Sequence, residues 1–263
     1  MGDAFPADGP VGLVEALADV SAIGPYFAVS TDPGGENDPL WRPLSELSSD
    51  TDALRAKVTD FERRLGTGES RVAASILFQG LAARLWSPVV GAVTAHGLLP
   101  VAAPAHLRWR PVPTGPLPLW TPRTAGWASV SGAEPGEVAV LVHHAVVTEL
   151  LEPMERAIQN ITKIAPSLLW GNAASALAGT LRTLPVARPD LAPRAARLIR
   201  EVLRLGELAG TGELAEPAPG QYFFVRTSCC LYYRVPGGGM CDDCALLAPE
   251  SRDAQWAQAV RRT

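Results

Sequence analysis

Apolar residues recur at helical spacing through most of the first 210 positions of the chain. The clearest case spans residues 69–96, where apolar residues at four-residue steps form one face of a helix. These residues are Leu77, Leu81, Leu85, Val89 and Val93. Pro88 lies inside this pattern, and because proline lacks an amide proton it is expected to kink the helix or split it in two. The pattern predicts a long, buried helix.

Five further stretches have the apolar spacing or the terminal residues of helices. They are residues 11–24, 50–65, 137–162 with an interruption at Pro153, 167–184, and a helix capped by Asp190 that runs to Leu208. The helix ending at Leu65 is the best defined. Asp50 or Thr51 supplies an N-cap before it, and Gly66 follows its last residue.

Short strand-like segments lie between these helices. Strands are predicted at residues 27–31, 107–110, 117–120 and 127–131. Proline is frequent between residues 101 and 122, and because it cannot donate to a hydrogen-bond ladder, the strands there are expected at sheet edges. The Gly-, Pro- and Glu-rich residues 210–220 predict a loop.

The order of these elements predicts an α+β fold that is predominantly helical, with a small β component. Three regions follow from it. Residues 1–70 form an N-terminal helical and loop segment, residues 71–210 a mainly helical body with a proline-rich β insertion at 101–131, and residues 221–250 a segment that contains every cysteine.

Composition narrows the class of protein. Apolar residues make up 47% of the chain, charged residues 19%, and the formal net charge is −4. Without a basic stripe, this composition argues against nucleic-acid binding.

Residues 1–10 lack the cationic start and apolar core of a secretory signal. Arg84 lies within the longest apolar stretch, where a charge at the centre of a membrane span costs about 2.5–3.5 kcal/mol. We therefore expect no transmembrane segment and a cytoplasmic location, with a peripheral position at the inner face of the membrane as a variant of it.

The four cysteines are the strongest chemical signal in the sequence. Cys229, Cys230, Cys241 and Cys244 have the spacing C-C-x10-C-x2-C. Residues 231–240, between the pairs, predict a short strand followed by a glycine-rich turn, which folds the second pair back toward the first. The second pair is a chelating loop found in zinc and iron–sulfur proteins alike. The adjacent first pair favours a two-iron cluster, because neighbouring side chains diverge and a cluster offers ligand positions on two metal ions. A [2Fe–2S] cluster is therefore predicted, with zinc or a disulfide as alternatives.

A family resemblance becomes visible at this motif. Arg226-Thr-Ser-Cys-Cys230 and Cys241-x-x-Cys244, with their ten-residue spacer, resemble the C-terminal signature of the FhuF-type ferric-siderophore reductases. Weaker similarities to this family and to siderophore synthetases lie at residues 169–175 and 150–154. The resemblance implies a [2Fe–2S] cluster on the four cysteines and one-electron reduction of a ferric siderophore, which releases Fe²⁺. Such a reaction requires no catalytic acid, base or nucleophile.

Several other residues are candidates for the surroundings of the cluster or the chelate. Arg226 and Arg234 are expected either to offset nearby negative charge and attract an anionic chelate, or to be ordinary surface arginines. Trp170 and Asn172 either line a chelate pocket and support the cluster loop, or pack at a helix terminus. A group of aromatic residues is expected to shield the cluster from water: Tyr222, Phe223, Phe224, Tyr232 and Tyr233.

The electron source is expected to be another protein. The chain has no glycine-rich nucleotide motif in strand–turn–helix context, so a nicotinamide or flavin site within it is not predicted. The main alternative function is a [2Fe–2S] electron carrier or a redox or iron sensor without siderophore activity. A zinc-stabilised binding module is a third possibility.

Overall fold

The computed structural model describes residues 12–100 and 106–261. The expectations for residues 1–10 and for the start of the proline-rich insertion lie outside the described residues. The helices are α1 Leu13–Ser21, α2 Glu46–Ser49, α3 Thr51–Leu65, α4 Ser70–His96, α5 Pro135–His143, α6 Glu152–Ile161, α7 Pro166–Ala187, α8 Ala192–Val202 and α9 Pro249–Val260. The strands are β1 Val29–Ser30, β2 Arg42–Pro43, β3 Leu98–Pro100, β4 Arg108–Trp109, β5 Leu119–Trp120, β6 Trp127–Ser129, β7 Gly212–Ala218 and β8 Gln221–Arg226. The expected α+β class with predominant helix is confirmed.

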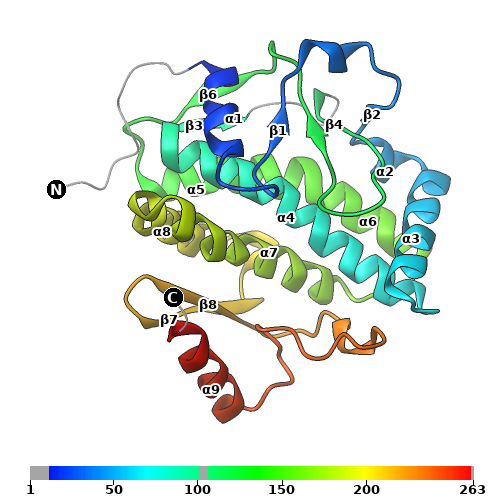
Figure 1. Ribbon diagram of the computed structural model, residues 1–263, viewed down its shortest axis with the longest axis vertical. Helices are drawn as coiled ribbons and strands as arrows, with labels where there is room; N and C mark the ends of the chain where they lie inside the picture. The colour runs from blue at the N-terminus through cyan, green and yellow to red at the C-terminus, as the bar shows by residue number, and fades with distance from the viewer. Residues whose placement is uncertain (1–11, 101–105, 262–263) are drawn as a thin grey trace.

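Two long helices, α4 and α7, pack side by side through the middle of the molecule (Figure 1). Their small and apolar residues are buried along most of both helices. By length and composition α4 would suffice to cross a membrane, but 78% of its apolar window is buried inside the fold. Its apolar character is therefore explained by its position in the core.

The charged residue in the middle of α4 is satisfied by backbone carbonyls. Arg84 is buried and donates from Nε to Leu117 O at 2.6 Å, from Nη2 to Ala28 O at 2.5 Å, and from Nη1 to Tyr26 O. Burial lowers its pKa to about 10, so it remains a cation at neutral pH. Arg84 thus joins the N-terminal segment and the β5 region to the central helix.

Helix boundaries follow the sequence signals closely where local capping decides them. Asp50 accepts from the amides of Asp52 and Ala53 at the start of α3, and Gly66 ends α3 in the left-handed conformation at φ 63°. Pro88 does not split α4, because packing against α1, α3 and α7 holds the helix through the lost hydrogen bond.

Two helix predictions need correction. At Pro153 the chain stays helical: a π-helical segment, His144–Leu151, leads into α6, and Pro153 lies in the first turn of α6, where it needs no amide proton. Asp190 does not cap a helix to Leu208. It lies in a short 3-10 turn with its carboxylate on Arg188, and α8 follows it and ends at Val202.

The β component forms three small sheets. One has four strands in the order β1-β5-β4-β2, in which β1 and β5 are parallel, and another pairs β3 with β6. These sheets include the predicted strands of the proline-rich insertion. The expectation of edge positions is wrong for β4 and β5, which occupy the two middle positions of their sheet. Both strands are only two residues long and contain no proline, so their amides are available for pairing. The third is the β7–β8 hairpin, which replaces the loop predicted at 210–220. Pairing with the apolar strand β8 overrides the weak strand propensity of β7, and Gly220, at φ 74°, closes the turn.

The C-terminal unit of the fold packs on one side of the central helices. Figure 1 shows the β7–β8 hairpin, the cysteine loops and α9 on the side of α7 away from the N-terminal strands. Strand β8 contacts α7 directly. Helix α9, which the sequence analysis did not predict, is anchored by Trp256, whose ring stacks on Phe223 at 5.0 Å between centroids. The cysteine loops are thereby held against α4 and α7.

Candidate metal centre

The first cysteine pair follows directly after β8. Cys230 is buried and Cys229 is half-buried. The strand predicted after them is wrong: Leu231 adopts a left-handed conformation at φ 67°, and Tyr232–Arg234 is a 3-10 turn. This bend directs the Leu231 amide to Cys229 Sγ at 3.4 Å and the Tyr232 amide to Cys230 Sγ at 3.5 Å. Such a conformation is costly for a non-glycine residue, and it gives each thiol of the pair a backbone donor.

The second pair lies on a tight turn. The Cys244 amide donates to Cys241 O at 3.1 Å, and the Leu246 amide approaches Cys244 Sγ at 3.4 Å. The Arg226 amide donates to Asp243 O at 3.4 Å, which ties this turn to the end of β8. Backbone contact between the two loops therefore fixes the second pair next to the first.

One thiol of the first pair contacts one thiol of the second pair. Cys230 Sγ and Cys241 Sγ are 3.5 Å apart. The hydrogen bond between them lowers the pKa of Cys230 and raises the pKa of Cys241. Burial raises the pKa of Cys229. All four cysteines are free thiols.

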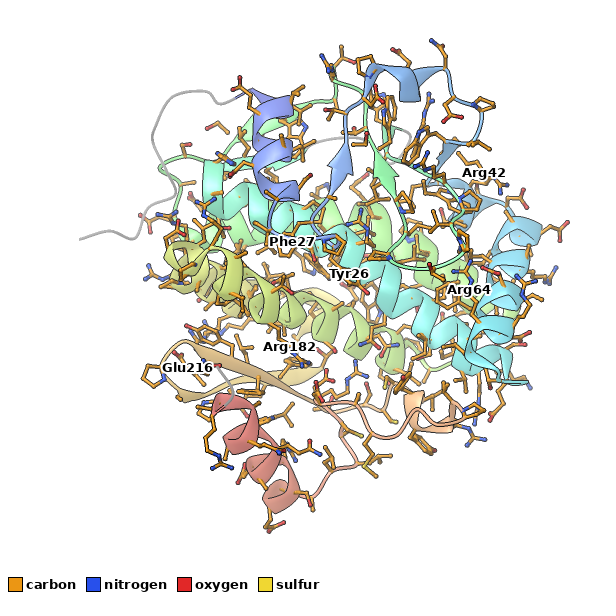
Figure 2. All side chains as sticks on the ribbon, viewed as in Figure 1. Tyr26, Phe27, Arg42, Arg64, Arg182 and Glu216 are labelled. Carbon is orange, nitrogen blue, oxygen red and sulfur yellow. The ribbon has the colours of Figure 1, made fainter. Side chains whose placement is uncertain are left out.

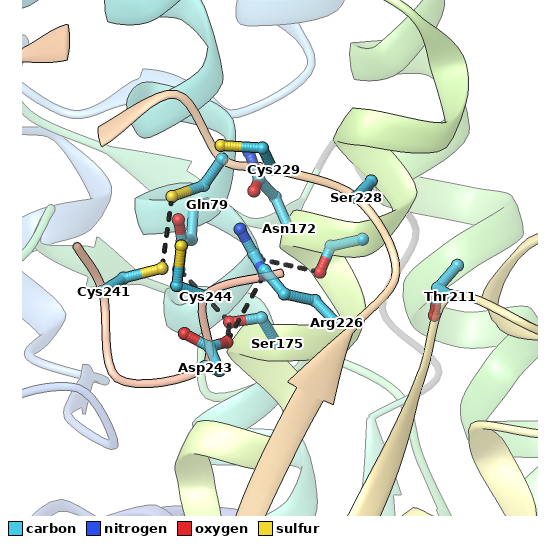
Figure 3. Close-up of polar contacts among 12 residues, drawn as sticks. Gln79, Asn172, Ser175, Thr211, Arg226, Ser228, Cys229, Cys241, Asp243 and Cys244 are labelled. Carbon is cyan, nitrogen blue, oxygen red and sulfur yellow. Dashed lines mark hydrogen bonds and ion pairs between the residues drawn. The ribbon is translucent and has the colours of Figure 1, made fainter. Parts of the chain in front are cut away.

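Arg226 supplies positive charge beside these sulfurs. Its side chain is fully buried, so the interpretation as a surface arginine is wrong. Nη2 donates to Gly171 O at 3.0 Å, and Nε lies 3.5 Å from Asp243 Oδ2. Figure 3 shows the side chain pointing from the end of β8 toward the cysteine loops, and its charge lowers the pKa values of Cys229, Cys230 and Cys241. Nε and Nη1 have no hydrogen-bond partner.

Asn172 supports the first cysteine loop from α7. Its Nδ2 donates to Ser75 O at 2.9 Å and to Ser75 Oγ at 2.8 Å, and Ser75 Oγ donates to Cys230 O at 2.6 Å. Asn172 therefore contacts the cluster loop through Ser75. Trp170 instead packs in the core, with its ring edge-on to Phe78 at 6.3 Å.

The remaining candidates lie farther from the thiols. Arg234 pairs with Glu69, the residue before α4, at 2.8 Å, and this bridge holds the 3-10 turn after the first pair. The aromatic residues have separate roles: Phe223 stacks on Trp256, Phe224 is buried in the core, and Tyr233 is exposed. Tyr232 lines the same cleft as Cys230 and Cys241, and so do Tyr222, Phe223 and Phe224.

That cleft is the feature that sequence reasoning did not find. It has a volume of about 650 Å³ and lies between α4, α7, β8 and the cysteine loops. Cys230 and Cys241 are part of its wall. Small residues of both central helices open it, among them Gly80 on α4 and Gly179 on α7, where an added Cβ would meet nothing within 4 Å. Figure 2 places Arg182 between α7 and the hairpin and Tyr26 beside α4; both line the cleft.

A polar group connects the cleft to the cysteine loop. Asp243 accepts a hydrogen bond from Ser175 Oγ and lies beside Arg226, while Gln79 Nε2 lies 3.4 Å from Ser175 Oγ (Figure 3). No sequence signal identifies Ser75 or Gln79, because each meets the loop across many residues of intervening chain. Ser175 ends the segment 169–175, whose weak similarity assigned it no role.

The residues fit an anionic iron–sulfur cluster. Free thiols, amides directed at three of the sulfurs and a buried guanidinium with two unpartnered donors all favour bound negative charge. Among residues 12–100 and 106–261, no three Cys, His, Asp or Glu side chains are arranged to hold a single metal ion. Two of the four thiols, those of Cys230 and Cys241, are in contact.

Comparison with known protein families identifies the segment. Residues 226–246 match the family model described as the FhuF 2Fe-2S C-terminal domain. No curated protein matches the chain. The match covers Arg226 and all four cysteines, whereas the weaker similarities at residues 150–154 and 169–175 lie outside it and stay predictions. Since the matched domain carries a [2Fe–2S] cluster, the chain is an iron–sulfur protein with a FhuF-type [2Fe–2S] domain at residues 226–246.

Proposed function

We propose that the protein reduces a ferric siderophore by one electron and so releases its iron as Fe²⁺. The observation that carries this proposal is the cleft of about 650 Å³ whose wall includes Cys230 and Cys241. Its volume is within the range of about 300–1,000 Å³ found for small-molecule sites. A chelate bound there would touch the thiolates that hold the cluster.

The reaction requires no catalytic acid, base or nucleophile among the side chains. A bound cluster would supply one electron to the chelated Fe³⁺, which is the substrate, and no bond to the protein would be made or broken. Siderophore oxygens are hard ligands suited to a small, highly charged ion, so the loss of one charge weakens their hold on the iron. The chain's residues bind and orient the chelate, and the four cysteines are proposed as the cluster ligands.

The polar residues of the cleft suit this task. Arg182 pairs with Asp242 at the exposed side, and Gln79 and Ser175 present an amide and a hydroxyl near the cysteines. The rest of the wall is mainly apolar or small. Such a mixed surface can hold a chelate whose outside carries both hydrocarbon and amide groups.

The electron donor and the location complete the proposal. An external redox protein would reload the cluster, since the sequence carries no nucleotide-binding motif for a second cofactor. The reaction is placed in the cytoplasm, where siderophore iron is used.

The test is single-turnover oxidation under anaerobic conditions. The dithionite-reduced protein is mixed with ferric hydroxamate, catecholate and carboxylate chelates, and the visible spectrum of the cluster is followed together with trapping of Fe²⁺. At least one chelate class should reoxidise the cluster and yield one Fe²⁺ per electron. A reduced cluster that persists with every class would refute the proposal and favour an electron carrier or sensor.

A cleft variant separates binding from the cluster itself. Gly179→Phe places a ring in the cleft where an added Cβ meets no atom, so the cluster spectrum should persist while reoxidation slows by about tenfold or more. Gly136→Phe is the matched control. It introduces the same ring at a helical glycine with equally open surroundings outside the cleft, and should leave the rate unchanged.

A further inference from the structure

The two halves of the cysteine motif meet through one sulfur of each. Cys230 Sγ lies 3.5 Å from Cys241 Sγ. Two thiolates on one tetrahedral metal, with bonds of about 2.3 Å, lie about 3.8 Å apart. The observed contact is therefore close to the separation that ligands of the same iron require.

The neighbouring cysteines are held differently. Cys229 is adjacent to Cys230 in sequence, yet each has its own backbone donor, from Leu231 and Tyr232 respectively. Cys244 has a third donor, the Leu246 amide. The two thiols of the first pair thus have separate backbone donors, and in the second pair only Cys244 has one within the described part of the chain, as expected if the two members of a pair bind different metal ions.

Exposure to the cleft divides the cysteines in the same way. Cys230 and Cys241 belong to the cleft wall, whereas Cys229 and Cys244 do not. The pair in contact is also the pair that a molecule in the cleft would meet.

We propose that each iron binds one cysteine from each sequence pair. Cys230 and Cys241 bind one iron, and Cys229 and Cys244 bind the other. The first iron is the one on the side of the cleft. This arrangement differs from that expected of a chelating loop, in which Cys241 and Cys244 would bind the same ion. The pairing rests on the thiol contact, and only its orientation toward the chelate rests on the proposed function.

Mössbauer spectroscopy of the reduced, ⁵⁷Fe-labelled holoprotein tests the pairing, because it resolves the ferric and ferrous sites of a one-electron-reduced cluster. Serine can still ligate through oxygen, so each Cys→Ser variant should alter mainly the iron that it binds. Cys230→Ser and Cys241→Ser are expected to alter one subspectrum, and Cys229→Ser and Cys244→Ser the other. The proposal is overturned if Cys229→Ser and Cys230→Ser alter the same site.

A second measurement removes the dependence on variants that lose the cluster. A crystal structure of the unmodified holoprotein, with iron located by anomalous scattering, shows which two sulfurs bind each iron. Cys230 and Cys241 on one iron would support the proposal, and Cys241 and Cys244 on one iron would overturn it. The pairing fails or holds independently of chelate reduction, so these experiments and the single-turnover test give separable answers.

Discussion

Replacement of Arg226 should lower the reduction potential of the cluster. The guanidinium is fully buried, acts on the thiols of three cysteines, and has two donor nitrogens without a partner. Reduction adds one negative charge to the cluster, so a nearby fixed cation stabilises the reduced form. Arg226→Gln removes the charge and keeps a polar side chain that can still donate to Gly171 O.

Coulomb's law gives the size of the effect. A unit charge about 6 Å from the added electron, at an effective dielectric constant of about 20, contributes about 3 kcal/mol. Asp243, 3.5 Å from Arg226 Nε, is present in both proteins, so its charge does not alter the difference between them. About 3 kcal/mol corresponds to a decrease of about 130 mV for a one-electron couple.

The assay is a redox titration followed by EPR, with cluster content measured on each sample. Arg226→Lys keeps the charge and should shift the potential less than Arg226→Gln, while Asp243→Asn should shift it upward. Arg234→Gln is the matched control: it removes an arginine from the same segment whose partner, Glu69, lies at the surface, and should leave the potential nearly unchanged. A potential for Arg226→Gln equal to or above that of the wild type, with the cluster fully retained, would refute the reasoning.

Three further predictions concern stability. In Gly171→Ala the new Cβ would lie 2.2 Å from Ser228 Oγ, which must rotate away and give up its hydrogen bond to Ser167 O, so denaturant unfolding should show a loss of about 0.5–1.5 kcal/mol, whereas Gly179→Ala in the same helix has open space and should not be destabilised. Asn172→Leu leaves the Ser75 carbonyl and hydroxyl without their buried donor and should cost about 1–3 kcal/mol in the same assay; an unchanged midpoint would show that Asn172 does not support the loop. Burial lowers the pKa of His143 in the folded state, so the unfolded state binds more protons below about pH 6.5 and the melting temperature should fall between pH 7.5 and 5.5. His143→Gln should reduce that fall, and an identical pH dependence in both proteins would contradict the assignment.

Local signals in the sequence were sufficient where neighbours along the chain decide the conformation. Asp50 and Gly66 delimit α3 because capping and left-handed glycine act within a single helical turn. The residues after the first cysteine pair predict a strand, but they form a 3-10 turn. The reason is that the Leu231 amide bonds to the sulfur of Cys229 instead of a neighbouring strand.

Non-local pairing explains the predictions that failed. Strand β7 has the composition of a loop and becomes a strand because β8 lies beside it. The sequence left open whether Arg226 offsets charge near the cysteines or is a surface arginine, and the fold decides this by burying it between α7 and the second cysteine loop.

The sequence by itself determined the cofactor and the ligand types, because the spacing of four thiols is a local property of about twenty residues. Only the tertiary structure decided that Cys230 meets Cys241, that Arg226 is a buried counter-charge and that a cleft opens beside two of the thiols. The physical reason is distance along the chain: Ser75 and Cys230 are 155 residues apart, and periodicity tells which face of a helix is buried but not what covers it.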